Sequence, residues 1–86
     1  MDDVESLVGT ARALTGEIFA HARTKLLAGA DPGHTHRQVS MAIRLLEDVE
    51  TYAILAASGD RDAENAIARR IHSLETVSDG LRPQGD

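Results

Sequence analysis

Hydrophobic residues recur along this chain at steps of three and four, the spacing that returns a side chain to the same side of an α-helix. In the first such segment the recurring positions are Val4, Leu7, Val8, Ala11, Leu14, Ile18, Ala22 and Leu26. Two further segments of this kind follow, and no segment alternates hydrophobic and polar residues as a β-strand does. The pattern therefore predicts three helices, at about residues 3–28, 32–58 and 61–79.

The start of the second predicted helix is marked by residues that cap helices. Asp31 can accept a hydrogen bond from the backbone of the first turn, and Pro32 suits the first helical position, where an N–H is not needed. Thr35 and Gln38 have the spacing of a capping box, which would start the helix one turn later. Either start, or both within one turn, is compatible with the sequence.

Short connections between the helices predict how they pack. Gly29 is placed to end the first helix and Gly59 to end the second. Only Ser58–Asp60 separates the second helix from the third, and connections this short place successive helices side by side in opposite directions. We therefore expect one all-α domain over residues 1–80, an up-down-up three-helix bundle completed by dimerisation, and a frayed tail at 81–86.

The second predicted helix is hydrophobic around more of its circumference than the other two. At about 100° per residue its hydrophobic residues form two stripes. The first consists of Val39, Ala42, Ile43, Leu46, Val49, Ala53 and Ala57, and the second of Met41, Leu45, Tyr52 and Leu55. An exposed hydrophobic stripe usually marks an interaction surface, so we predict that the second stripe is the interface of a homodimer. The alternative is that helix ends and the N-terminal segment cover it.

The first predicted helix carries a line of small residues on the side opposite its main hydrophobic stripe. These residues are Gly9, Ala13, Gly16 and Ala20. A glycine inside a helix costs about 1 kcal/mol relative to alanine, so two of them invite an explanation. Small side chains allow another helix to come close, which makes this line a second possible interface. The alternative is an exposed face without a partner.

Two charged residues fall within the hydrophobic stripes of their helices. Glu50 lies within the stripe of the second helix and Arg70 within that of the third. If the hairpin turns near Gly59, residue 50 lies opposite residue 68, close to Arg70. We therefore predict an internal ion pair between Glu50 and Arg70 that fixes the register of the two helices.

Composition narrows the classes of function. The formal net charge is −5, and the nine basic residues are scattered, which disfavours nucleic acid as a partner. The chain has no cysteine, and its longest hydrophobic run is Tyr52–Ala57, so we expect no disulfide, no signal peptide and no membrane span. These features predict a cytoplasmic protein. No phosphate-binding glycine loop, nucleophile elbow or evident Ser-His-Asp set is present, and we expect neither an enzyme nor a bound cofactor.

Histidines and carboxylates leave a metal site as an alternative. His34 and His36 are weak candidates for metal ligands, because a spacing of two places both rings on one side only in an extended chain. A set of carboxylates and histidines on the helices is the other possibility: Glu17, His21, Glu50, His72 and Glu75. Of these, Glu17 and His72 fall on the sides of their helices that point away from the core. The Glu-x-x-His motif of helical di-iron sites is missing.

Together these observations predict a small helical protein–protein interaction module, such as an adaptor, a regulator, an inhibitor or an accessory subunit. It is expected to bind itself through the second helix and to bind another protein. The alternative is a helical bundle that binds a metal or a small ligand through histidines and inward carboxylates.

Overall fold

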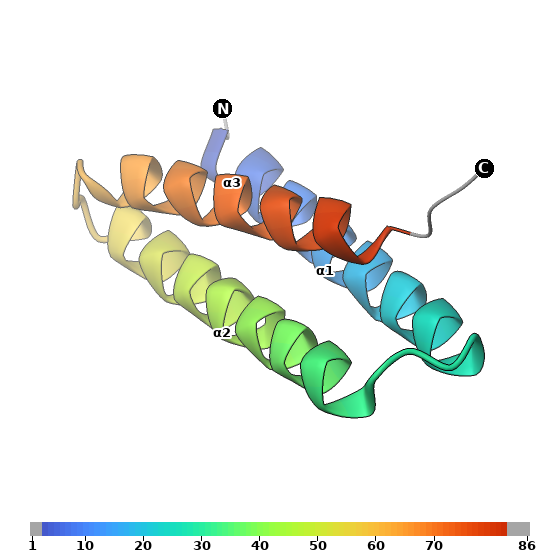
Figure 1. Cartoon of the computed structure of the whole chain (residues 1–86). Coiled ribbons are helices and arrows are strands. Elements are labelled where there is room, and N and C mark those ends of the chain that lie inside the picture. The colour runs from blue at the N-terminus through green and yellow to red at the C-terminus, as the bar shows by residue number, and fades with distance from the viewer. Residues whose placement is uncertain (1–2, 83–86) are drawn as a thin grey trace.

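The computed structural model, which describes residues 3–82, consists of three α-helices (Figure 1). They are α1 (Asp3–Leu27), α2 (Pro32–Ala57) and α3 (Ala63–Leu81). Each helix packs against the other two, successive helices run in opposite directions, and the described residues form no strand. The prediction of an all-α three-helix bundle is thus confirmed.

The first turn of α2 shows which residue caps it. The carboxylate of Asp31 accepts a hydrogen bond from the backbone N–H of His34 at 3.0 Å, and Pro32 is the first helical residue. The hydroxyl of Thr35 is buried and donates to the carbonyl oxygen of Asp31 at 3.0 Å. The helix therefore begins after Asp31, and the later start at a Thr35–Gln38 capping box is not used.

Two glycines end the first two helices as predicted. Gly29 has a φ of 95° and Gly59 a φ of 103°, which is the left-handed region that other residues rarely adopt. Each follows within two residues of the end of its helix, at Leu27 and Ala57. The positive φ redirects the chain at both corners, so these two positions require glycine.

The third helix differs from the prediction at both ends. The backbone N–H of Asp62 donates to the carboxylate of Asp60 at 2.9 Å, and this turn delays the start of α3 to Ala63. At the other end the helix continues through Leu81, which is only 1% exposed because it packs into the core. Residue 81 therefore belongs to the bundle and not to the predicted tail, of which residues 83–86 lie outside the described part of the chain.

The core is built on residues spaced by seven in all three helices. These lines are Ala11 and Ile18 in α1, Thr35, Ala42 and Val49 in α2, and Ile67, Leu74 and Leu81 in α3, and every member is almost completely buried. A spacing of seven returns to within about 20° of the same side of a helix, as in coiled-coil packing. The three lines fix the rotation of each helix about its own axis, and this rotation decides what remains on the surface.

Candidate interaction surface

The rotation of α2 about its own axis leaves only two of the four residues of the predicted interface stripe exposed. Ala42 and Val49 face the core, and Leu45 and Tyr52 each lie three residues further on, about 60° around the helix. Leu45 and Tyr52 are half-buried and pack against the core of their own chain. Of the predicted four, only Met41 and Leu55 are exposed large side chains. The stripe is therefore not a continuous exposed surface.

Tyr52 faces α3 and is covered there by Arg70. The guanidinium carbon of Arg70 lies 4.9 Å from the centre of the Tyr52 ring, a cation–π geometry. The Nε of Arg70 also lies 3.6 Å from a carboxylate oxygen of Asp48. Arg70 thus contacts Tyr52 and Asp48 of α2, whereas the predicted partner was Glu50.

Glu50 pairs across the other groove, with Arg12 of α1. Its two carboxylate oxygens accept hydrogen bonds from the Nε and NH2 nitrogens of Arg12 at 2.7 and 3.0 Å. These bonds hold the pKa of the Glu50 carboxyl below its ordinary value, and they raise the pKa of the Arg12 guanidinium.

The predicted Glu50–Arg70 pair is therefore wrong, because both residues bind other partners. The antiparallel pairing of α2 and α3 was anticipated, but the rotation of α2 was not. Glu50 follows Val49 by one residue, about 100° around the helix, whereas Tyr52 follows Val49 by three, about 60° the opposite way. Glu50 consequently lies on the α1 side of α2 and Tyr52 on the α3 side.

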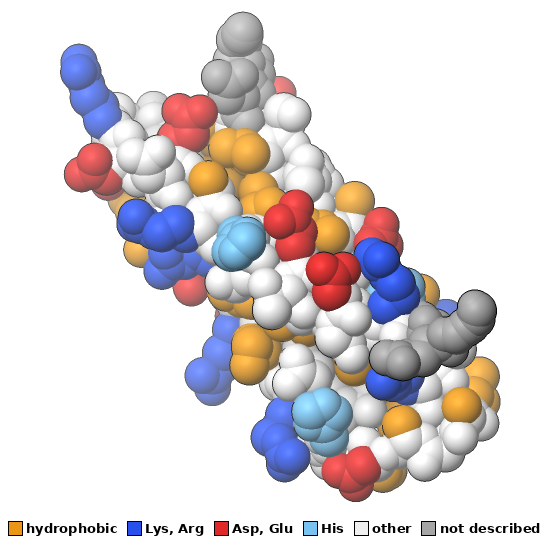
Figure 2. Space-filling view, turned by 45° about the horizontal axis from the view of Figure 1, so that its top comes forward, with side chains coloured by type: hydrophobic (Ala, Val, Ile, Leu, Met, Phe, Trp, Pro, Cys, Tyr) orange, Lys and Arg blue, Asp and Glu red, His pale blue; other side chains and the backbone are white. Residues whose placement is uncertain are grey.

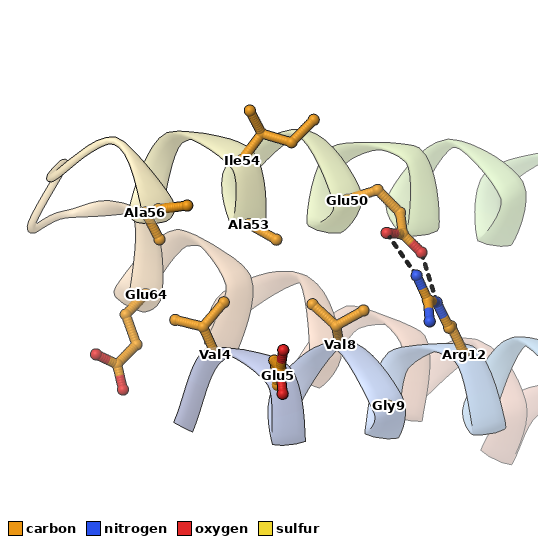
Figure 3. A pocket seen from close by; sticks show the side chains of 11 residues that line it. Val4, Glu5, Val8, Gly9, Arg12, Glu50, Ala53, Ile54, Ala56 and Glu64 are labelled. Carbon is orange, nitrogen blue, oxygen red and sulfur yellow. Dashed lines mark hydrogen bonds and ion pairs between the residues drawn. The ribbon is translucent and has the colours of Figure 1, made fainter. Parts of the chain in front are cut away.

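Four large exposed hydrophobic side chains lie along the α1–α2 side of the bundle that carries the Arg12–Glu50 pair. Phe19 and Leu26 follow Arg12 at spacings of seven, so they share its side of α1. Ile43 precedes Glu50 by seven, which puts it on the same side of α2. Ile54 follows Glu50 by four and projects from the neighbouring edge of α2, away from α1 (Figure 3). Their exposed fractions are 41% for Phe19, 45% for Leu26, 41% for Ile43 and 69% for Ile54. We call this surface, formed by these four residues along the α1–α2 groove, the open face.

Figure 3 shows one end of this groove, with α1 and α2 side by side, Arg12 and Glu50 bridging them, and α3 behind. The open face is thus turned away from α3. None of the three helices that the structure describes covers it, because α3 occupies the opposite side of the α1–α2 pair.

A hollow of about 810 Å³ opens where the N-terminal half of α1 meets the end of α2 (Figure 3). Its hydrophobic lining consists of Val4, Val8, Ala53, Ile54, Ala56 and Ala57. Glu5 of α1 and Glu64 of α3 supply negative charge, and the Arg12–Glu50 pair closes the hollow toward the middle of the groove. The hollow therefore adjoins the open face at Ile54, its lining is mostly hydrophobic, and acids of α1 and α3 border it.

The small residues predicted as a second interface are all exposed: Gly9, Ala13, Gly16 and Ala20. A Cβ atom added to Gly9 or to Gly16 would meet nothing within 4 Å. Within residues 3–82, no other helix therefore packs closely on Gly9 or Gly16, and Gly9 lines the hollow.

The candidate metal ligands are dispersed. His34 and His36 are exposed at the start of α2, and the described residues contain no group of three or more histidines or acids that could hold a metal ion. Glu17 and Glu75 do line one small hollow between α1 and α3, and the imidazole of His72 lies 3.8 Å from Glu75. On the face shown in Figure 2, acidic, basic and histidine side chains are interspersed.

Reasoning from the sequence did not identify the open face. Leu26 and Ile43 were assigned to the main hydrophobic stripes of their helices, and no role was predicted for Phe19, Ile54 or Arg12. The sequence does relate the residues of the open face to Arg12 and Glu50 by spacings of four, seven and fourteen. These spacings indicate a shared face only when Arg12 and Glu50 are known to pair.

Among the described residues no helix is long and hydrophobic enough to cross a membrane. Comparison of the chain with known protein families, with curated proteins and with solved structures finds no match.

Proposed function

We propose that this chain is a small helical protein–protein interaction module that binds through its open face. The observation that carries the proposal is the grouping of Phe19, Leu26, Ile43 and Ile54 on one side of a bundle that has few large hydrophobic residues. Self-association through α2 remains part of the proposal, because Ile43 and Ile54 belong to α2. The residues that we assign to this contact are Ile43 and Ile54, in place of the predicted stripe of Met41, Leu45, Tyr52 and Leu55.

The open face has the properties of a groove for a helix. Two antiparallel helices leave a shallow channel between them, and a third helix already fills the equivalent channel on the other side. Exposed hydrophobic side chains that line such a channel lose contact with water when another helix packs there, at about 25 cal/mol per Å² of apolar area. An amphipathic helix is therefore the kind of segment that the surface fits best.

The other exposed pair on α2 is a weaker candidate. Met41 and Leu55 are separated by 14 residues, or about 21 Å along the helix. Between them on the same side lie Asp48 and Arg70, whose charged groups contact each other. The hydrophobic area there is interrupted, so we assign the main contact to the open face.

Photo-crosslinking in the native host tests this proposal. A photoreactive amino acid at position 43 or at position 54 is expected to give crosslinked protein products, because both positions point out of the open face. Position 44 serves as the control, since Arg44 is exposed and follows Ile43 by about 100°.

Products of equal yield at positions 43, 54 and 44, or none at 43 and 54, would contradict the proposal. Products at positions 41 and 55 in place of 43 and 54 would move the interface to the α3 side of α2.

A further inference from the structure

The two ends of the open face differ in both shape and charge. At one end lies the hydrophobic hollow with Glu5 and Glu64 at its border. At the other end Leu26 projects from α1, 45% exposed, and Arg23 lies next to it on the same side, four residues after Phe19. One end is thus a hollow with negative charge and the other a projection with positive charge.

We infer that the partner on the open face is a second copy of this chain, docked antiparallel about a two-fold axis, a step that rests on the proposed function. The axis crosses the middle of the face at right angles to the helices. In a two-fold contact the same patch of both copies meets itself, so each copy must carry both complementary features. The open face does so, because it contains the hollow and the projection at opposite ends.

The positions of the residues along the axis of α1 agree with this arrangement. The helix spans Asp3–Leu27, so its middle lies at residue 15. Leu26 lies 11 residues beyond the middle, and the two-fold axis brings it level with Val4 of the other copy, in the lining of the hollow. Arg23 comes level with residue 7 of the other copy, about 3 Å along the axis from Glu5.

Charge selects the antiparallel arrangement over the parallel one. A two-fold axis parallel to the helices would place α1 of one copy on α2 of the other, with the acidic end of each copy level with the acidic end of its mate and Arg23 level with Arg23. Like charges that face each other across an interface are unfavourable, whereas the antiparallel arrangement pairs opposite charges at both ends.

The size of the face is also sufficient. Two helices of about 38 Å, each about 10 Å wide, present roughly 38 × 20 Å, or about 760 Å². Specific interfaces bury about 800 Å² per partner. The α1–α2 side of the bundle, of which the open face is the exposed hydrophobic part, is therefore large enough for a standard dimer contact.

Sedimentation equilibrium of the full chain, with the chain's helix content checked by circular dichroism, is the first test. We expect a dimer that Leu26→Glu and Ile54→Glu dissociate. Arg23→Glu alone and Glu5→Arg alone should each weaken the dimer by roughly ten-fold, and the two changes together should restore it. Arg44→Glu makes the same charge change away from the face and should have little effect.

Disulfide crosslinking tests the direction, because the natural chain has no cysteine. A mixture of Glu5→Cys and Leu26→Cys chains should form the mixed disulfide in preference to either symmetric one, since the bond requires Cα atoms within about 7 Å. Thr24→Cys, which is exposed and lies about 160° around α1 from Leu26, is the control and should not crosslink with Glu5→Cys.

A monomer at several hundred micromolar would overturn this inference and leave the proposed function intact, provided that position 43 crosslinks to a different protein. A dimer that Leu55→Glu dissociates and Leu26→Glu does not would overturn the assignment of the face. A dimer in which the charge exchange fails to restore binding, or in which the symmetric disulfides dominate, would overturn the antiparallel arrangement.

Discussion

At the scale of single residues, the Arg12–Glu50 pair is the feature with the clearest chemical consequence. Its two hydrogen bonds lower the pKa of the Glu50 carboxyl in the folded chain. A carboxyl whose pKa is lowered on folding stabilises the folded state above its unfolded pKa, about 4.3 for glutamate. This contribution is lost as the pH falls through the lower folded-state pKa. Because both side chains are well exposed, solvent and salt screen the pair.

We therefore expect Glu50→Gln to lower the melting temperature slightly at pH 7 in low salt. The difference from the natural chain should shrink as the pH falls below about 4.3, where the natural carboxyl also becomes neutral. Thermal melts followed by circular dichroism across this pH range provide the measurement.

Glu47→Gln is the matched control for this prediction, since Glu47 lies on the same helix and makes no ion pair with a described residue. It should change the melting temperature less than Glu50→Gln does. An equal effect of the two substitutions at pH 7, or a Glu50→Gln effect that persists unchanged in acid, would show that the pair does not stabilise the fold.

At the scale of the elements, the rotation of each helix about its axis decides the surface. Ala42 and Val49 face the core of the bundle, so Leu45 and Tyr52 are drawn into it and Ile43 is turned out. A hydrophobic stripe as wide as that of α2 permits more than one rotation. Which one is adopted depends on the side chains that α1 and α3 present to it.

The glycines inside α1 give an element-scale prediction. A Cβ added to Gly16 has open space around it, so Gly16→Ala should stabilise the monomer by about 0.5–1 kcal/mol through helix propensity. Urea denaturation in dilute protein measures this change. Gly59→Ala is the control and should destabilise, because Gly59 has a φ of 103°.

Loss of stability in Gly16→Ala would mean that another helix already lies against the line of small residues. That result would support the second predicted interface at Gly9, Ala13, Gly16 and Ala20.

At the scale of the whole molecule, the chain combines a small core with an uncovered hydrophobic face. A domain of 86 residues buries only about 60–65% of the surface of its unfolded chain, which leaves a thin margin of stability. Many of its buried side chains are alanine or valine, such as Ala11, Ala42, Val49 and Ala66. Burial of the open face against a second copy would add apolar area that the single chain does not supply.

Because dimerisation would stabilise the folded chain, we predict that thermal stability depends on protein concentration. If only the folded chain dimerises, mass action raises the melting temperature as the concentration rises. We expect an increase between low and high micromolar protein for the natural chain, and none for Leu26→Glu. A melting temperature that is the same at all concentrations would count against dimerisation of the folded state.

Features that involve only neighbouring residues were predicted better from the sequence than features that involve side chains of two helices. Residues whose role is local were predicted well: Gly29 and Gly59 end two helices, and Asp31, one of the two starts that the sequence left open for α2, caps it. Features that depend on two helices at once were not. Glu50 was paired with Arg70 although it binds Arg12, and Leu45 and Tyr52 were expected in an exposed stripe although they are half-buried against the core of their own chain.

The sequence by itself determined the three helices, two of their turns and the all-α class. Capping, positive φ and the spacing of hydrophobic residues act within a few residues of one another, so they can be read along the chain. The tertiary structure alone decided which side of α2 faces inward, which groove receives Glu50, and that Phe19, Leu26, Ile43 and Ile54 share one face. Those outcomes depend on the close packing of three helices against each other, in which the position of each side chain is set by residues far away in the sequence.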